Sequence, residues 1–395
     1  MPLPFHLPQI GEDEITEVIA TLRSGWLTTG PRTKQFEADF ALYIGTKHAV
    51  ALNSATAALH LALEAVGLSR GQAVLVPSLT FAATAEVVRY FDAKPLLVDC
   101  GPDFNLDCDH ARQVARAARA AGEDVRVIIP VHYGGQVVDM AGLQRLVAEF
   151  GLTVIEDAAH CCPASYRDSS TAPWKSVGTE SAVSCFSFYA NKCITTGEGG
   201  MACTNDDALA ARMRTMALHG ISKDAWKRFT SEGSWYYEIV APGYKYNLTD
   251  IAAAIGIHQL RKADQFRAER ARVAEQYRAA LGAVEEIILP TEGPDRIHSW
   301  HLFVIRLRLD RLTIDRAQVI SELKQAGFGT SVHWMPLHMH PYYRTTYGYQ
   351  PEDLPMSAKL FWEIISLPIY PGMTTQDVAA FCAALTGIIA RNRKP

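Results

Sequence analysis

Short apolar runs alternate with amphipathic stretches through the first two-thirds of the chain. The apolar runs predict strands at 48–52, 73–76, 95–99, 125–130, 153–157, 182–187 and 200–204. Between them, apolar residues recur at a spacing of three and four, which predicts helices at 55–65, 82–90, 106–121 and 140–150. This alternation is typical of an α/β domain with a mostly parallel sheet.

The pattern changes after the segment APGYKYNLTD at 241–250. A long stretch with many charges on one face predicts a single helix from about Asp250 to Leu281, and shorter helix and strand signals follow it. We therefore predict a large α/β domain over 1–250 and a smaller α+β domain over 251–395. The polar stretch 167–175 is expected to be an inserted loop.

Composition excludes several classes of function. The 395 residues are 48% hydrophobic and 20% charged, which is usual for a globular protein. The formal net charge is -4, so the chain lacks the basic field that binds nucleic acid. The N-terminus lacks the pattern of a secretory signal and no apolar run is long enough to cross a membrane, so we expect a cytoplasmic protein that binds no membrane.

The metal-binding residue types do not form a recognisable site. None of the eight cysteines belongs to a CxxC pair, and several lie in apolar runs, so we expect reduced, buried thiols. His333, His338 and His340 are close in sequence, but their spacing matches no standard ligand pattern. We therefore predict no metal site.

Residues with possible chemical roles follow two of the predicted strands. Ser54 and Thr56 begin a helix, whose free N–H groups and positive dipole end could hold an anion. An ordinary helix cap is the alternative. Asp157 ends the strand at 153–157, and the carboxyl ends of parallel strands face a ligand crevice. A capping aspartate is the alternative there.

Lys192 lies between apolar and aromatic residues and precedes a glycine-rich turn. A partly desolvated lysine has a lowered pKa and can act as a nucleophile and a base, although a surface lysine with a buried stem is the alternative. Ser187, five residues earlier, could contact the same anion as Ser54 and Thr56. Phe81 follows another predicted strand and could lie flat on a ring, or belong to the core.

The strand ends thus supply, in chain order, an anion pocket, an aromatic ring, an acid and an amine. Together these groups fit pyridoxal 5'-phosphate (PLP), because the acid can keep the pyridine nitrogen protonated and the amine can bind the aldehyde.

Longer motifs are spread nearly from one end of the chain to the other. They are SGWLTTGP (24–31), SATAALHLAL (54–63), VPSLTFAAT (76–84), IPVHYGG (129–135), VIEDAAH (154–160), SFYANKCITTGEGG (187–200), PGYKYNLTDIAAAIG (242–256), WHLF (300–303), GTSVHWMPLH (329–338) and SLPIYPGMT (366–374). In these motifs the chain resembles the DegT/DnrJ/StrS family of PLP-dependent sugar aminotransferases. The resemblance implies PLP-dependent transferase fold type I, that of aspartate aminotransferase.

The same resemblance implies a role for individual residues. Lys192 is expected to bind PLP as a Schiff base, and Asp157 to contact the pyridine nitrogen. The other expected cofactor contacts are Ala55, Thr56 and Ser187 at the phosphate, Phe81 on the ring, and His160 beside the ring hydroxyl.

Asn247, together with Lys245, is expected to reach the phosphate in the other subunit, so the active site would need a homodimer. Contacts to the sugar nucleotide are expected from Thr28, Tyr189, His219, His333 and His338.

The expected reaction is transamination of a nucleotide-linked keto-sugar, with L-glutamate as amino donor, for cell-surface polysaccharide or lipopolysaccharide synthesis. The sequences of these motifs are most similar to those of family members that act on a UDP-linked 4-keto sugar. A dTDP- or GDP-linked keto-sugar, a carbocycle such as scyllo-inosose, and a non-catalytic regulator are the alternatives. Lys192 favours transamination, since a branch of the family that dehydrates sugars carries histidine there. The family usually has asparagine at the position of Cys193.

Overall fold

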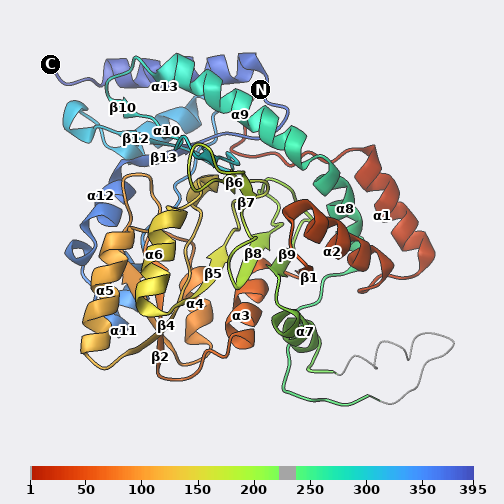
Figure 1. Ribbon diagram of the computed structural model, residues 1–395. Coiled ribbons are helices and arrows are strands. Elements are labelled where there is room, and N and C mark those ends of the chain that lie inside the picture. Colours follow the sequence, from red (N-terminus) through yellow and green to blue (C-terminus); the bar gives the residue numbers. More distant parts are fainter. Residues whose placement is uncertain (1, 222–236) are drawn as a thin grey trace.

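Seven strands form the central sheet of the computed structural model, which describes residues 2–221 and 237–395 (Figure 1). In spatial order they are β1 (His48–Leu52), β9 (Gly200–Thr204), β8 (Val183–Ser187), β5 (Thr153–Asp157), β4 (Asp124–Ile128), β2 (Gln72–Pro77) and β3 (Lys94–Val98). β9 is antiparallel to β1 and β8, and the other neighbours are parallel. The carboxyl ends of the parallel strands therefore meet at one edge, where β9 begins with Gly200.

Helices cover both faces of this sheet because side chains alternate between the faces along each strand. In β2, for example, Ala73 and Leu75 face one core while Val74 and Val76 face the other. The first core is covered by α2 (Pro31–Ile44), α5 (Cys108–Ala120) and α6 (Met140–Phe150). The second is covered by α3 (Ala55–Ala65), α4 (Ala83–Arg89) and α7 (Asp207–Met216).

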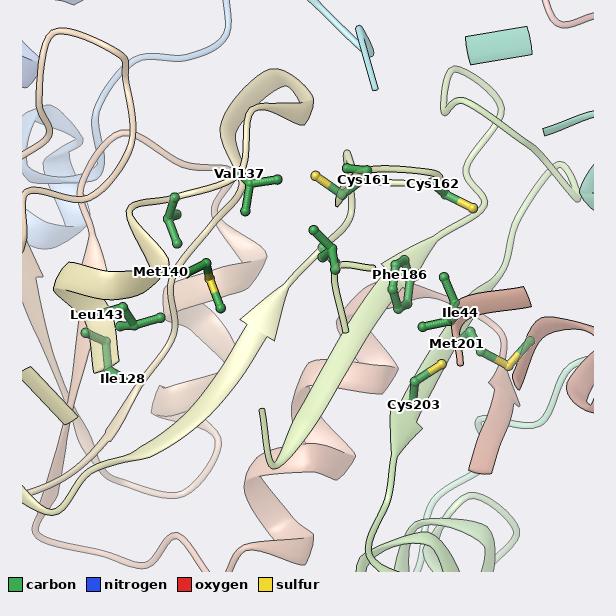
Figure 2. Packing of buried hydrophobic residues seen from close by; sticks show 14 of the residues in the cluster. Ile44, Ile128, Val137, Met140, Leu143, Cys161, Cys162, Phe186, Met201 and Cys203 are labelled. Atoms are coloured by element: carbon green, nitrogen blue, oxygen red, sulfur yellow. The ribbon is translucent and has the colours of Figure 1, made fainter. Parts of the chain in front are cut away.

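Figure 2 shows part of the first core, in which sulfur-containing side chains lie among aromatic and aliphatic ones. Phe186 of β8 is paired with Met201 of β9, and Cys203 lies on the same face. All eight cysteines are free thiols, and all but Cys108 are buried. The predicted burial of the thiols is therefore confirmed for seven of them, and their reduced state stays a prediction.

The predicted helix over 250–281 is wrong in one respect, because the structure divides it. α8 (Asp250–Arg261) ends at Lys262, where α9 (Ala263–Leu281) begins in a new direction (Figure 1). The break has a packing cause. α8 packs against α2 and against α1 (Glu12–Ser24). At the end of α8, Lys262 Nζ contacts both carboxylate oxygens of Glu14 in α1 at 2.9 Å. α9, in contrast, belongs to another core.

That other core lies in the C-terminal part, which packs above one end of the large sheet (Figure 1). Its three-stranded sheet contains β10 (Ile287–Ile288), β12 (Phe303–Leu307) and β13 (Ile364–Leu367), covered by α9, α10 (Arg316–Gln325) and α13 (Thr375–Arg391). Leu3 of the N-terminal segment also belongs to this core. The division into domains at 1–250 and 251–395 stays a prediction.

The remaining elements are short. They are β6 (Ser165–Tyr166), β7 (Lys175–Ser176), β11 (Arg296–Ile297), α11 (Pro341–Tyr347), α12 (Pro355–Glu363), η1 (Tyr133–Gly135), η3 (Leu309–Arg311), η4 (Leu337–Met339) and η5 (Pro351–Asp353). The polar stretch 167–175 joins β6 to β7 and is tied to the chain before β11 by Arg167, whose Nε lies 2.8 Å from Asp295 Oδ1. Among the described helices, none combines the length and apolar character needed to cross a membrane.

Candidate active site

A cavity of about 430 Å³ opens at the edge of the sheet where the parallel strands end. We call it the Lys192 cavity. Asp157 ends β5 and Ser187 ends β8, while Phe81 and Thr56 follow β2 and β1, and all four line the cavity together with Lys192. The structure thus brings together the residues that the sequence places at separate strand ends.

One end of the cavity is formed by the N-terminus of α3. Ser54 caps the helix, since its Oγ accepts a hydrogen bond of 3.1 Å from Ala57 N. The N–H groups of Ala55 and Thr56 have no partner among the described residues, as expected for the first turn of a helix. Two free donors at the positive end of a helix dipole are suited to bind a phosphate.

Gly200 allows the helix to approach β9 this closely. A Cβ atom at this position would lie 2.3 Å from the carbonyl carbon of Ser54 and 2.5 Å from Ala55 N. Any larger residue would therefore have to push the first turn of α3 away from the sheet.

Asp157 is held by two hydrogen-bond donors. Thr84 Oγ1 donates to its Oδ2 at 2.8 Å, and Ala159 N donates to its Oδ1 at 3.1 Å. Burial raises the pKa of Asp157, while these two donors and the charge of Lys192 oppose the rise. A further positive charge in the cavity would stabilise the carboxylate form.

Lys192 is the amine of the cavity. Burial lowers the pKa of Lys192 from 10.5 to about 8, and the negative charge of Asp157 opposes this shift. Lys192 N donates to Tyr189 O at 2.9 Å in a turn that fixes the start of the side chain. The amine is therefore neutral in a much larger fraction of molecules near neutral pH than an ordinary lysine is.

His160 forms part of an aromatic wall. Its Nδ1 accepts a hydrogen bond of 3.1 Å from Gly134 N, so the proton of the neutral ring is on Nε2. Burial and nearby cations lower the pKa of His160 well below its usual value. Trp334 stacks on His160 with ring centroids 5.3 Å apart, and Phe81 lies 6.2 Å from Trp334. A flat ligand ring suits such surroundings.

Three further residues of the cavity were not predicted as site residues. Trp334, His301 and Asn191 line it, and the atoms His301 Nδ1 and Asn191 Oδ1 are buried without a hydrogen-bond partner among the described residues. All three lie within the sequence motifs. The motif sequences alone do not show whether these residues line a site or belong to the core. The unsatisfied polar atoms of His301 and Asn191 could bind a polar ligand in the cavity.

The predicted substrate residues divide into two groups. Tyr189 and His333 line the Lys192 cavity, and His333 Nδ1 lies 2.8 Å from Ser366 Oγ. His338 does not line it, because its ring is buried with Nδ1 2.7 Å from Ser78 Oγ. Thr28 and His219 also lie outside the cavity of their own chain.

Asn247 lies outside the cavity too. Its Nδ2 donates to Thr29 Oγ1 at 2.7 Å, and Lys245 Nζ donates to its Oδ1 at 2.5 Å. Asn247 therefore makes no contribution to the lining of the cavity in its own chain.

The three histidines that are close in sequence each form a hydrogen bond with a different partner. His333 pairs with Ser366, His338 with Ser78, and His340 Nε2 lies 3.2 Å from Met335 O. No group of three or more metal-ligating side chains occurs in the described ranges.

Comparison with known proteins decides the family. The model of the DegT/DnrJ/EryC1/StrS aminotransferase family matches residues 8–386. The chain belongs to this family. It is 41% identical over 388 residues to the spore coat polysaccharide biosynthesis protein SpsC of Bacillus subtilis, covering 98% of this chain and 97% of SpsC. It is also 46% identical over 392 residues to an uncharacterised protein of Methanocaldococcus jannaschii, covering 99% and 98% of the two chains.

Solved structures of aminotransferases share the fold. A sugar aminotransferase of Streptococcus pneumoniae, in its pyridoxamine phosphate form, superposes with a TM-score of 0.89 at 31% identity, covering 98% of this chain and 99% of the other. Its PLP form gives 0.88 at 30% identity, covering 99% of each chain. PseC of Helicobacter pylori gives 0.88 at 25% identity, covering 99% and 100%. The predicted PLP-dependent transferase fold is therefore confirmed, and the enzyme is a PLP-dependent sugar aminotransferase.

The residues of the Lys192 cavity fit PLP. The free N–H groups of α3 suit its phosphate, the Asp157 carboxylate suits a protonated ring nitrogen, and the Lys192 amine, whose pKa burial lowers to about 8, suits its aldehyde. The unsatisfied buried atoms of His301 and Asn191 are consistent with a polar ligand in this space.

Proposed function

We propose that this enzyme transfers an amino group to a keto-sugar carried by a nucleotide, namely a UDP-linked 4-keto sugar, with L-glutamate as the amino donor. The observation that carries the proposal is that Lys192 and Asp157 border one cavity that also ends at the N-terminus of α3. The named functions of the relatives, sugar aminotransferase and polysaccharide biosynthesis, support a sugar as the acceptor.

Bound PLP supplies an electron sink that stabilises negative charge on the substrate carbon. In our proposal Asp157 keeps a proton on the pyridine nitrogen, and Thr84 and Ala159 orient its carboxylate for this task. Ala55, Thr56 and Ser187 hold the phosphate.

Lys192 has two roles in this scheme. Its amine would hold the cofactor aldehyde between reactions, and as a free base it would move the proton at the substrate carbon. Both roles need a neutral amine, which the buried position favours by lowering the pKa of Lys192 to about 8. His160 and Trp334, stacked on each other, would exclude water from the ring, with His160 beside the ring hydroxyl. Phe81 would stack on the ring.

The complete site would be a property of a homodimer. Asn247 and Lys245 lie outside the cavity of their own chain, so we assign them to the phosphate in the other subunit. Tyr189 and His333 are the substrate contacts from the same chain, and Thr28 and His219 would contribute across the interface. Eight free thiols agree with the reducing cytoplasm as the location of the reaction.

A half-reaction screen tests the proposal. The enzyme is first converted to its pyridoxamine phosphate form with L-glutamate, and UDP-, dTDP- and GDP-linked keto-sugars and scyllo-inosose are then added separately. We expect a UDP-linked 4-keto sugar to restore the absorbance of the PLP form fastest. Restoration by scyllo-inosose alone would contradict a nucleotide-linked substrate, and no restoration by any keto compound would contradict the proposed reaction.

A further inference from the structure

An amino-acid donor has to place its carboxylate close to Lys192. The carboxylate is bonded to the same carbon as the amine, and that amine must take the position of the Lys192 amine at the cofactor aldehyde. The groups that recognise the carboxylate therefore lie beside Lys192, not at the phosphate end of the cavity, where Ser54 and Thr56 begin α3. This requirement rests on the proposed function, and it holds for any donor that carries both groups on one carbon.

The Lys192 cavity contains no arginine for this purpose within residues 2–221 and 237–395. Burial lowers the pKa of each of the three histidines that line it, so their rings are neutral. An arginine would bind a carboxylate well, but it would be a buried, unpaired charge when the uncharged end of a keto-sugar occupied the same place. Neutral donors can serve both substrates in turn, because they bind a carboxylate or a hydroxyl group.

Asn191 supplies one neutral donor beside the lysine. It directly precedes Lys192 in the chain and lines the same cavity. Its Oδ1 is enclosed by protein and has no hydrogen-bond partner among the described residues. The side chain therefore meets the cavity through Nδ2, which carries two N–H groups.

His301 supplies the second donor. It is 4% exposed and lines the cavity, and its Nδ1 is enclosed without a partner in the part of the chain that the structure describes, so Nε2 is the ring nitrogen that faces the cavity. The ring lies against His160 with centroids 4.3 Å apart. Leu302 N donates to Gly134 O at 3.0 Å, and Arg270 Nη1 donates weakly to His301 O at 3.4 Å. These contacts hold the ring and its backbone in place.

We propose that Asn191 Nδ2 and His301 Nε2 bind the α-carboxylate of the amino-acid donor beside Lys192. The proton of the neutral His301 ring is then on Nε2, and each group donates a hydrogen bond to a carboxylate oxygen. The same two donors contact hydroxyl groups of the keto-sugar after the amino acid has left as a keto acid. The pair makes the site specific for donors with a carboxylate on the amine-bearing carbon.

Stopped-flow absorbance of the PLP-loaded enzyme tests this site with two ligands, L-glutamate and L-isoglutamine, in which an amide replaces the α-carboxylate. For the wild type we expect the Kd of L-isoglutamine to be about 10- to 100-fold higher, since a hydrogen bond to a charged group is lost. His301→Phe keeps a flat ring against His160, and Asn191→Leu keeps a similar volume. Each should narrow the ratio of the two Kd values by about tenfold.

His48→Phe is the control, because His48 pairs with Asp207 at the surface and lies outside the cavity. This variant should keep the wild-type ratio of Kd values. A wild-type ratio in His301→Phe or in Asn191→Leu would overturn the assignment of that residue.

The donor half of the reaction needs no sugar nucleotide, so failure of this site is distinguishable from failure of the keto-sugar screen. If the wild type reacts with another L-amino acid instead of L-glutamate, the proposed donor is wrong, and that acid and its α-amide are compared in the same way. If the variants do not load PLP, a crystal structure of the loaded wild type with α-methyl-L-glutamate decides, since this ligand has no α-hydrogen to lose. We expect its α-carboxylate within hydrogen-bond distance of Asn191 Nδ2 and His301 Nε2. A carboxylate bound by other groups would overturn the proposal.

Discussion

Thr84 donates a hydrogen bond of 2.8 Å from its Oγ1 to Oδ2 of Asp157 at the carboxyl end of β5. Thr80 in turn lies 2.8 Å from Thr84 through their hydroxyl oxygens. The carboxylate proposed to meet the pyridine nitrogen is therefore oriented by a chain of buried hydroxyl groups and by Ala159 N, rather than by an arginine or lysine. This arrangement keeps Asp157 available to a positive charge on the ligand.

Replacing Thr84 by valine tests this arrangement. Valine keeps the shape but removes a donor to a charged group, which is worth roughly 1.5–3 kcal/mol, so kcat should fall by about 10- to 100-fold. Turnover and thermal unfolding are measured together, with Thr345→Val as the control because its hydroxyl lies on the exposed helix α11. Unchanged turnover in Thr84→Val would show that the hydrogen bond does not orient the acid.

The rate of PLP loading should depend on pH through Lys192. Only the neutral amine attacks the aldehyde, and burial lowers its pKa from 10.5 to about 8, so the neutral fraction rises with pH and saturates above about 8. Stopped-flow absorbance of apoenzyme mixed with PLP should therefore level off above that pH. A loading rate that still rises beyond pH 10.5 would mean that Lys192 behaves as an exposed lysine.

Gly200→Ala should weaken cofactor binding. The added Cβ meets the backbone of Ser54 and Ala55 at 2.3–2.5 Å, so the first turn of α3 must move. Since misplacing positioned groups by about 1 Å can cost about 100-fold, we expect the Kd for PLP to rise at least about tenfold. Gly387→Ala in α13 is the control, because its Cβ would meet only Arg391 Nη1, at 3.5 Å. Equal affinity for PLP in both variants would contradict a phosphate site at the N-terminus of α3.

His333 and His338 should respond differently to substitution. His333 lines the Lys192 cavity, so His333→Asn should raise KM for the sugar nucleotide by roughly 3- to 10-fold. His338 is buried against Ser78, so His338→Asn should lower stability by about 1–3 kcal/mol and leave KM unchanged. Steady-state kinetics and chemical denaturation of both variants check this. A raised KM in a stable His338→Asn enzyme would instead support a contact between His338 and the substrate.

Much of the large sheet could be predicted from the sequence because its strands are short apolar runs between turns. The bounds of β1, β5 and β9, and of α3 and α6, agree with the predicted ranges to the residue. The break at Lys262 could not be predicted, because charged and apolar positions keep a helical spacing across it. The two helices are separated by packing, because α8 packs against α1 and α2.

The sequence could predict those residues of the site that directly follow strands. Lys192, Asp157 and Thr56 could be placed at one edge because parallel strands end together. Trp334 and His301 reach the cavity from the C-terminal part of the chain, where no periodic pattern indicates the direction of a side chain. Their contribution depends on tertiary packing alone.

Reduction of the PLP-loaded enzyme with sodium borohydride, followed by peptide mass mapping, tests most directly whether Lys192 binds the cofactor. Reduction makes the bond between amine and cofactor permanent, so the label reports the residue that formed it. We expect the loaded protein to be yellow and the label to lie on Lys192 alone. A colourless protein after loading, or a label on a different lysine, would contradict the proposed role of Lys192.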